Sequence, residues 1–370
     1  MMEQMTQINI FDVLPESEAN KFKPIKSNDW KWTFADYPKE KNGLRVFSCF
    51  ACGGGSTMGY KLAGCDVIGC CEIDKKMNDV YVANHHPKYN YLMDIRDFNK
   101  QENLPEELYN LDILDGSPPC TTFSMAGDRE DSWGKKKKFR EGQTEQTLDD
   151  LSFVFIDTVA KLRPKTVIME NVEGLLLGNA WEYVRQIYAK FNEIGYQLRH
   201  YLCKGETMGV PQKRHRVFFI AVRNDIKFNF DNLDMNFNYE PVLFKEVKDK
   251  NNVIKPSDKT TELLKQAIPM KDKCLADVLI RTEKRNSRFN EMIVWDDNIA
   301  PTVHNHGIYR GNDVSKFSNL DYIHCQTFPE DYIVGSGQDI SYICGMSVPP
   351  IMIKRIVERL IDTNVFKEMM

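Results

Sequence analysis

Four side chains of this sequence have the types and positions needed for chemistry on a polar substrate. Cys120 follows two prolines within residues 116–124 (GSPPCTTFS), directly after the apolar run LDILD. Glu170 ends the apolar run TVIME, and Arg214 and Arg216 open the run RVFFIAV. A thiol in a stiff loop is a candidate nucleophile, and a carboxyl group can move protons. If the three runs are strands of one sheet, all four side chains lie at one edge and form a site.

Each of these residues also has an ordinary structural interpretation. A cysteine is more often a partly buried core residue, a glutamate at a strand end can cap the next element, and arginines can form a solvated edge. Cys49 and Cys52 match the C-x-x-C spacing of zinc ligands, but the adjacent Cys70 and Cys71 supply no second pair. We therefore expect buried structural cysteines and no metal site.

A glycine-rich turn follows the apolar run LRVFSCFA and predicts contact with a nucleotide-like ligand. Glycines at 53–55 let the backbone turn tightly and approach a ligand. The fingerprint G-x-G-x-x-G is not met, because Met58 stands at its third glycine, and this disfavours NAD. Glu72 ends the next apolar run, where a carboxylate binds a ribose hydroxyl pair or is merely solvated. Asp94 could cap a helix or accept from an adenine amine.

Apolar runs rich in β-branched and aromatic residues alternate with helix-like stretches from Leu44 to Arg223. This alternation predicts an α/β domain with a parallel sheet covered by helices on both faces. Residues 225–317 are more polar and show no clear period. We expect four segments: an N-terminal extension at 1–40 with Trp30 and Trp32 as anchors, a catalytic and cofactor-binding domain at 41–224, a small irregular domain at 225–317, and a C-terminal segment at 318–370 that returns to the catalytic domain.

Composition indicates an intracellular globular protein but not its activity. Of the 370 residues, 42% are hydrophobic, which is enough for a sizeable core. No run approaches the roughly 20 apolar residues of a membrane span, and the first residues lack an apolar export signal. The 10 cysteines are scattered, as is typical of a reducing cytoplasm. The net charge of -4 disfavours nucleic acid only weakly, because a basic groove can lie on an acidic body.

Six motifs together resemble the cytosine-C5 DNA methyltransferases of prokaryotes and phages. They are FACGGG, CEID, SPPCTTFS, MENV, QKRHR and, at 345–350, GMSVPP, and they occur in the family's order. The resemblance covers nearly all of residues 44–223 and the chain from about Tyr322 onward. It implies the S-adenosylmethionine-dependent methyltransferase fold, which is a Rossmann-like mixed sheet with helices on both faces, plus a small irregular target-recognition domain.

The resemblance also implies a reaction and the residues that perform it. The Cys120 thiolate would attack C6 of a cytosine flipped out of the duplex, so that C5 can accept a methyl group. Glu170 would hydrogen-bond or protonate N3, Arg216 would bind the O2 side, and Arg214 would help to position Cys120 and the base. The cofactor S-adenosylmethionine would be bound by Phe50, Gly54, Gly55, Glu72, Asp94, Ile95, Pro119, Leu151 and Ser347.

Double-stranded DNA is the substrate that the resemblance implies. Candidate DNA contacts are the basic run after the nucleophile and a basic cluster in the recognition segment, namely Lys135, Lys136, Lys137, Lys138, Arg140, Arg281, Lys284 and Arg285. We further expect a cytoplasmic monomer without membrane contact and, as a candidate partner, a cognate restriction endonuclease. Two alternatives stay open: a tRNA cytosine-C5 methyltransferase, and a catalytically silent DNA-binding protein of the same fold.

The sequence departs from the family's usual motifs at several positions. Ser48 replaces an aspartate, Cys52 a glycine, Thr121 a glutamine or asparagine, Leu320 an arginine and Met346 an asparagine. Because Thr121 and Met346 lie near the expected methyl-transfer pocket, one hypothesis is an altered cofactor affinity or tolerance of a larger transferred group. Harmless drift is the alternative.

Overall fold

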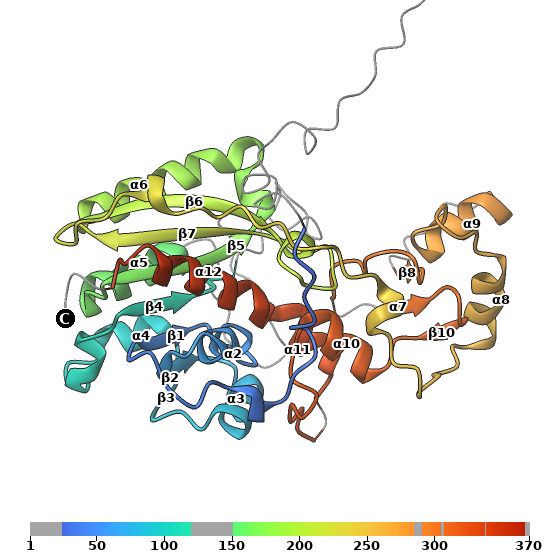
Figure 1. Ribbon diagram of the computed structural model, residues 1–370, viewed down its shortest axis with the longest axis horizontal. Coiled ribbons are helices and arrows are strands. Elements are labelled where there is room, and N and C mark those ends of the chain that lie inside the picture. The colour runs from blue at the N-terminus through green and yellow to red at the C-terminus, as the bar shows by residue number, and fades with distance from the viewer. Residues whose placement is uncertain (1–23, 120–150, 285–290, 305–306, 337, 367–370) are drawn as a thin grey trace, which may run out of the picture.

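The computed structural model describes residues 24–119, 151–284, 291–304, 307–336 and 338–366. Figure 1 shows a large twisted sheet layered between helices, and a smaller lobe to one side that carries α7, α8 and α9. Helices α10 and α11 lie between the large sheet and this smaller lobe (Figure 1). The site described below is built where the large sheet meets these two helices.

The large sheet has seven strands in the order β3-β2-β1-β4-β5-β7-β6. β7 runs antiparallel to its neighbours β5 and β6, whereas the other neighbouring strands are parallel. The amino end of β7 therefore meets the carboxyl ends of the parallel strands at one edge, where Arg216 pairs with Val172. The strands are β1 (Arg45–Cys49), β2 (Asp66–Glu72), β3 (Tyr89–Leu92), β4 (Ile113–Gly116), β5 (Thr166–Val172), β6 (Tyr196–Lys204) and β7 (His215–Arg223).

Both faces of this sheet are buried, which explains the continuous apolar runs in the sequence. Consecutive strand residues point to opposite faces: Phe47 packs with α4, α5 and α6, and Val46 packs with α2 and α12. The predicted α/β sheet with helices on both faces is confirmed. The helices are α2 (Gly55–Leu62), α3 (Lys75–His85), α4 (Ile95–Lys100), α5 (Leu151–Leu162), α6 (Trp181–Glu193), α10 (Asn319–Gln326), α11 (Ile340–Met346) and α12 (Pro350–Asp362).

The smaller lobe has regular elements where the sequence predicts irregular structure. It contains helices α7 (Phe244–Val247), α8 (Asp258–Gln266) and α9 (Leu275–Glu283), and strands β8 (Met292–Val294), β9 (Ile308–Arg310) and β10 (Ser315–Lys316). The strands form a sheet in the order β10-β9-β8, and Trp295 joins α8 and α9 in a separate apolar cluster. The sequence analysis did not identify these strands, because strands of two or three residues are too short to produce a visible period.

Two tryptophans fasten the N-terminal extension to the C-terminal segment, as the sequence predicts. The Trp32 indole nitrogen donates to the carbonyl of Thr327 at 2.9 Å. The Trp30 ring packs edge-on against His324, with ring centroids 4.9 Å apart. Both tryptophans are buried. The extension and α10 therefore share one apolar core, although nearly 300 residues separate them in sequence.

A buried ion pair joins the smaller lobe to α10. The Arg310 guanidinium at the end of β9 donates from Nε to Asp321 Oδ2 at 2.8 Å, and from Nη1 to the carbonyl of Asn252 at 3.0 Å. The exposed fractions of the Arg310 and Asp321 side chains are 1% and 0%. Leu320 occupies a position where an arginine is usual, and Arg310 brings a guanidinium to the neighbouring Asp321 from another element.

One described segment, Ile340–Asp362, is long and apolar enough to cross a membrane. Its apolar window is 78% buried inside the protein, however, and Pro349 divides the segment into α11 and α12. Burial of this extent is that of core helices, and α12 packs against α2 on one face of the large sheet.

We predict that Arg310→Ala lowers the free energy of unfolding by about 3–5 kcal/mol, because it leaves the buried Asp321 carboxylate without its cation. Denaturant unfolding followed by circular dichroism measures this change. Arg185→Ala is the matched control, because its ion pair with Glu182 is exposed (77% and 61%) and should contribute only about 0–1 kcal/mol. Equal changes in the free energy of unfolding for the two substitutions would contradict a stabilising role of the buried pair between the lobe and α10.

Candidate active site

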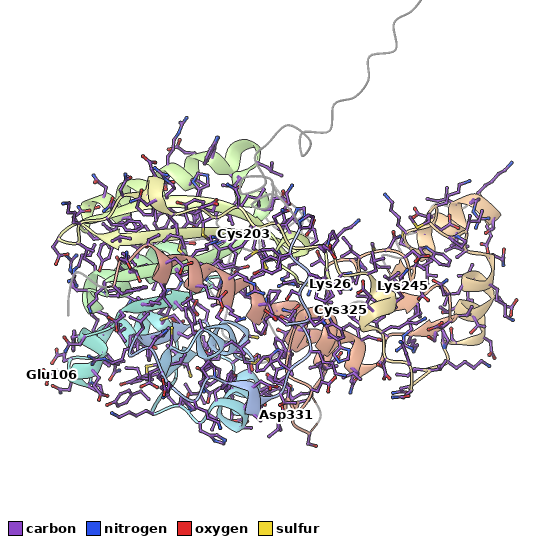
Figure 2. The ribbon with its side chains drawn as sticks, viewed as in Figure 1. Lys26, Glu106, Cys203, Lys245, Cys325 and Asp331 are labelled. Carbon is purple, nitrogen blue, oxygen red and sulfur yellow. The ribbon has the colours of Figure 1, made fainter. Side chains whose placement is uncertain are left out.

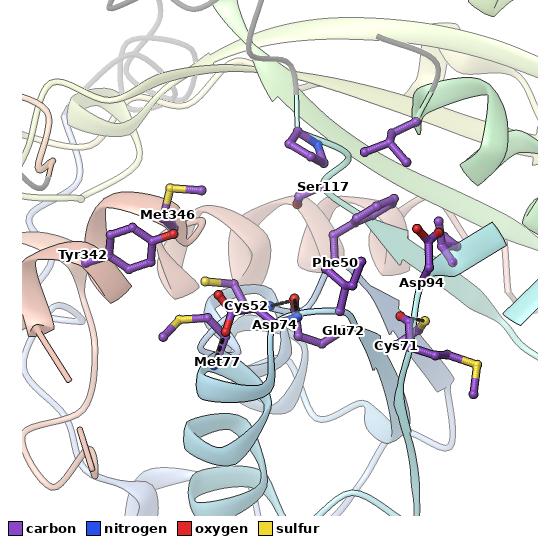
Figure 3. Close-up of a pocket in the computed structure, with 15 residues that line it drawn as sticks. Phe50, Cys52, Cys71, Glu72, Asp74, Met77, Asp94, Ser117, Tyr342 and Met346 are labelled. Carbon is purple, nitrogen blue, oxygen red and sulfur yellow. Dashed lines mark hydrogen bonds between the residues drawn. The ribbon is translucent and has the colours of Figure 1, made fainter. Parts of the chain in front are cut away.

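A cavity opens at the edge of the large sheet where β1, β2 and β4 end (Figure 3). Its empty space, counted out to the open mouth, is about 780 Å³. Tyr342 and Met346 on α11 face Phe50 and Asp94 across it (Figure 3). The lining residues are Phe50, Cys52, Cys71, Glu72, Ile73, Asp74, Met77, Met93, Asp94, Ile95, Ser117, Pro119, Leu151, Tyr342 and Met346.

The turn between β1 and α2 places Phe50 and Cys52 in the cavity wall. Its backbone is left-handed at three residues, with φ of 56° at Phe50, 46° at Cys52 and 86° at Gly54. A residue with a side chain takes this conformation at a cost of about 1–2 kcal/mol. The Cys52 N–H donates to Glu72 Oε2 at 2.8 Å, and this bond to a buried carboxylate offsets the strain. The cysteine that departs from the family's glycine is therefore accommodated in the turn.

Glu72 is held by backbone donors from two sides. Its Oε2 accepts from Cys52 and its Oε1 accepts from the N–H of Asp74, each at 2.8 Å. Burial raises the pKa of this carboxyl, and the two backbone donors act in the opposite direction. Each carboxylate oxygen retains further acceptor capacity, so Glu72 can also accept from a pair of ligand hydroxyls.

Gly54 and Gly55 are required by close packing around the turn. A Cβ at Gly54 would lie 2.0 Å from His85 Nε2, and a Cβ at Gly55 would lie 2.2 Å from the carbonyl oxygen of Val348. The preceding carbonyl, that of Gly53, accepts from Tyr332 Oη at 2.7 Å. Neither Gly54 nor Gly55 lines the cavity, so their predicted contact with a cofactor stays a prediction.

The other predicted cofactor residues divide into two groups. Asp94, Ile95, Pro119 and Leu151 line the cavity. Asp94 also caps α4, because its Oδ1 accepts from the N–H of Arg96 at 2.8 Å. Ser347 does not line the cavity; its side chain is buried and interacts with the Cys52 thiol.

The structure brings Glu170 and Arg216 together at the same edge. Arg216 Nε lies 2.8 Å from Glu170 Oε1, and both side chains are mostly buried, with 15% and 12% exposed. Asn171, the next residue after Glu170, donates from Nδ2 to the carbonyl of Pro118 at 3.5 Å. The loop that leads to Cys120 thus contacts the segment that carries Glu170. Cys120 itself, like Thr121, lies outside the described residues.

Arg214 has a different set of partners from Arg216. It is 3% exposed and donates through Nη2 to the carbonyls of Gly345 at 3.0 Å and Ser347 at 2.8 Å. Its Nη1 donates to the carbonyl of Val303 at 3.3 Å. Arg214 therefore holds the segment before α12 and the loop between β8 and β9 against the start of β7. Arg214 and Arg216 have no partner in common among these contacts.

Several cavity residues were not identified by the sequence analysis. Ile73 and Asp74 directly follow Glu72 in the CEID motif, and Met93 directly precedes Asp94. Their positions next to predicted cofactor residues were the only sequence feature that could have identified them. Met346, which the sequence analysis placed near the methyl-transfer pocket, lines the cavity. Tyr342, four residues earlier on α11, was not identified, although this spacing places both residues on one helix face. Only the folded chain shows that this face turns toward Phe50.

The predicted DNA contacts are only partly described. Arg281 is paired within the smaller lobe, where its Nη2 lies 2.7 Å from Asp272 Oδ2. Lys284 follows α9 in a left-handed conformation with an exposed side chain. Lys135, Lys136, Lys137, Lys138, Arg140 and Arg285 lie outside the described residues, and the role of the whole set in DNA binding stays a prediction.

Nine of the 10 cysteines fall within the described part of the chain, and burial raises the pKa of every one of these thiols. The pKa is about 11 for Cys65 and about 12 for Cys203. Figure 2 labels Cys203 and Cys325, both of which are buried. No cluster of three or more His, Cys, Asp or Glu side chains among the described residues has a metal-binding arrangement.

Comparison with known proteins agrees with this geometry. The family model described as C-5 cytosine-specific DNA methylase matches residues 44–362. The chain is 31% identical to the type II methyltransferase M.FnuDI of Fusobacterium nucleatum over 62% of its own length and 58% of that protein. It is 27% identical to the type II methyltransferase M.Sau96I of Staphylococcus aureus over 87% of its own length and 77% of that protein.

A solved structure shares the fold at low sequence identity. DNMT2 of Spodoptera frugiperda superposes with a TM-score of 0.61 and 16% identity, and the match covers 86% of this chain and 100% of that one. The predicted S-adenosylmethionine-dependent methyltransferase fold is confirmed by the sheet order and by this likeness. The family model spans most of the chain, including both parts of the sequence that carry the motifs. The chain belongs to the C-5 cytosine-specific DNA methylase family.

Proposed function

We propose that this protein transfers a methyl group from S-adenosylmethionine to C5 of a cytosine flipped out of double-stranded DNA, with Cys120 as the nucleophile. The observation that carries this proposal is the Glu170–Arg216 pair, which lies at the same sheet edge as the cavity. The Asn171 bond to Pro118 brings the loop that leads to Cys120 to this pair. Cys120, Glu170 and the cofactor would then lie at the same edge of the sheet.

The cavity residues fit S-adenosylmethionine. Phe50 offers an aromatic face to an adenine ring, and Glu72 has acceptor capacity for two ribose hydroxyls. Ser347 lies behind the wall beside Cys52, and its contact with the cofactor stays part of this proposal. When bound, this cofactor supplies an electrophilic methyl group.

Elimination supports Cys120 as the nucleophile. A thiol reacts as its thiolate, and burial opposes formation of the thiolate at each of the nine described cysteines. Cys120 is the remaining cysteine in the sequence, and it follows a proline that lines the cavity. A loop position at a strand end is also where α/β sheets bind their ligands.

Glu170 and Arg216 would handle the charge that develops on the base. The Cys120 sulfur forms a bond to C6, and the electron pair of the C5–C6 double bond becomes available at C5. Glu170 would donate a proton or a hydrogen bond to N3, and Arg216 would bind O2 while keeping Glu170 oriented. After C5 gains the methyl group it loses its proton, and the C6–sulfur bond breaks to restore the double bond.

Arg214 would act on the architecture of the site. It donates to the carbonyls of Gly345 and Ser347, which flank Met346 in the cavity wall, and so would hold this segment in place. Its third carbonyl partner is Val303. Arg214 directly precedes β7, two positions before Arg216, so it would also help to position Cys120 and the base.

We further propose that the chain is organised in four segments, with boundaries at residues 41, 225 and 318.

The substrate and partners follow from the family and its relatives. The relatives are named type II methyltransferases, which act in restriction–modification. We propose sequence-specific double-stranded DNA as substrate, a monomeric cytoplasmic enzyme, and a cognate restriction endonuclease as partner. The basic run Lys135–Lys138 would neutralise backbone phosphates.

The first prediction concerns the reaction. Bisulfite sequencing of plasmid DNA from cells that express the wild-type protein should show protected cytosines in one short sequence context. Cys120→Ala should abolish the protection, whereas the matched control Cys274→Ala, which changes a partly exposed cysteine of the smaller lobe, should retain it. Folded wild-type protein that protects no cytosine would contradict the proposal and redirect the search to RNA or to a silent binding protein.

The second prediction concerns the cofactor. Glu72→Gln should weaken S-adenosylmethionine binding by about 10- to 100-fold, because hydrogen bonds to a charged acceptor contribute about 1.5–3 kcal/mol. Isothermal titration calorimetry measures the dissociation constant. Glu107→Gln is the control, since this glutamate binds Lys88 and Tyr89 away from the cavity. An unchanged dissociation constant in Glu72→Gln would remove Glu72 from the cofactor site.

The third prediction concerns the basic run. Replacing Lys135, Lys136, Lys137 and Lys138 with glutamine should weaken DNA binding and lower the salt slope of log K by about 0.9 for each phosphate that is no longer neutralised. Fluorescence anisotropy at several salt concentrations gives this slope. The matched control replaces four exposed lysines on or beside α3, β3 and α4, namely Lys75, Lys76, Lys88 and Lys100. Identical slopes for the two variants would exclude a specific role for the run.

A further inference from the structure

A buried carboxyl group lies directly beneath the two loops of the proposed site. Asp115 on β4 is 2% exposed and is the register partner of Ser48 on β1. Its Oδ2 accepts from Ser48 Oγ at 2.6 Å, and its Oδ1 accepts from Tyr60 Oη on α2 at 3.0 Å. The cavity-lining residues do not include it, and no step of the proposed reaction uses it.

The position of Asp115 links two functional loops. Ser48 is followed by the turn that carries Phe50 and Cys52, and Asp115 is followed by Ser117 and Pro119, which also line the cavity. In the sequence, Cys120 comes next. The carboxyl therefore ties the base of the cofactor turn to the base of the nucleophile loop, with Tyr60 bracing both from α2.

The surroundings of Asp115 make its charge state sensitive to pH near neutrality. The pKa of this carboxyl is raised to about 7, chiefly by burial and to a smaller extent by Glu170, while the two hydroxyl donors act in the opposite direction. Asp115 pairs with Ile168 on β5, and Glu170 stands two residues further on, so both carboxyls project from one face of the sheet. The other titratable groups that interact with Asp115 are Cys49 on β1 and Tyr81 on α3. None of these groups carries a positive charge.

The hydrogen bonds differ between the two charge states. A carboxylate accepts from both hydroxyls, which is the arrangement observed here. A protonated carboxyl turns one oxygen into a donor, so the bond at that oxygen must reverse and the hydroxyl there must accept. Both hydroxyls donate to the carboxyl at the same time only when Asp115 is ionised.

We propose that ionised Asp115 is a positioning residue of methyl transfer, holding the cofactor turn and the nucleophile loop in register through Ser48 and Tyr60. This inference rests on the proposed function. It assigns no contact with substrate or cofactor to Asp115. The effect should appear in the rate of transfer, because binding of either ligand uses other residues.

The test measures the initial rate of tritium transfer from methyl-labelled S-adenosylmethionine to unmethylated plasmid DNA between pH 6 and 8.5. Asp115→Asn, which keeps the shape and removes the charge, should lower the rate about tenfold, equivalent to one lost hydrogen bond of about 1.4 kcal/mol. The ratio of wild-type to variant rates should rise as the pH passes about 7. The KM for S-adenosylmethionine should change much less than the rate.

Two further variants separate positioning from general damage. Asp112→Asn is the matched control, because Asp112 is also buried and precedes the same strand, but it binds Arg45 and Lys165 at the opposite edge of the sheet. It should leave the rate ratio near one. The exchange Ser48→Asp with Asp115→Ser returns one carboxylate and one hydroxyl to facing positions and should restore most of the lost rate. If Asp115→Asn does not fold, the exchange variant carries the test alone.

An independent readout does not need enzymatic activity. The folded protein keeps the Asp115 proton up to about pH 7, whereas an unfolded aspartate loses it near its ordinary value of 3.8. The wild-type protein should therefore lose stability relative to Asp115→Asn as the pH rises through this window. A folded Asp115→Asn with wild-type rate and an unchanged pH profile would overturn the inference. Wild-type protein that transfers no methyl group would instead overturn the proposed function, and the unfolding measurement would still test the state of Asp115.

Discussion

The reversal of β7 within an otherwise parallel sheet is the constraint on which the site depends. Parallel strands bring their carboxyl ends to one edge, and only a reversed strand can add its amino end there. Arg216 at the start of β7 consequently meets Glu170 near the end of β5, although 46 positions separate them in the sequence. The turn that carries Phe50, the Glu72 carboxylate and the loop that leads to Cys120 lie at strand ends of the same edge.

Long-range polar contacts complete this edge from the C-terminal part of the chain. Arg214 holds three carbonyls of distant segments, and Tyr332 holds the carbonyl of Gly53 in the cofactor turn. Such buried donors are costly unless they are satisfied, so the segment before α12 cannot move away without leaving unpaired groups. The wall that Tyr342 and Met346 form is thereby kept opposite Phe50.

The sequence predicts the elements of the large sheet and the meeting of Glu170 with Arg216, because both follow from local pattern and strand order. The place of Cys120 beside this pair stays a prediction. The sequence does not predict Tyr342 in the cavity wall, the Arg310–Asp321 pair or the link between Ser48 and Asp115, because these join positions that only the folded chain brings together. The departures at Ser48 and Leu320 become understandable in the structure: a carboxyl and a guanidinium are supplied beside them from β4 and β9. For Thr121, which lies outside the described residues, the structure offers no explanation.

The central claim is that Cys120 forms a bond to C6 of cytosine at this edge. Its most direct test uses DNA in which cytosine carries fluorine at C5, because loss of the C5 proton is then blocked and the enzyme stays attached. Mass spectrometry of the protease-digested complex should find the methylated nucleotide on the peptide that contains Cys120. Folded protein that forms no adduct with such DNA, or an adduct on any of the nine buried or partly buried cysteines, would contradict this account.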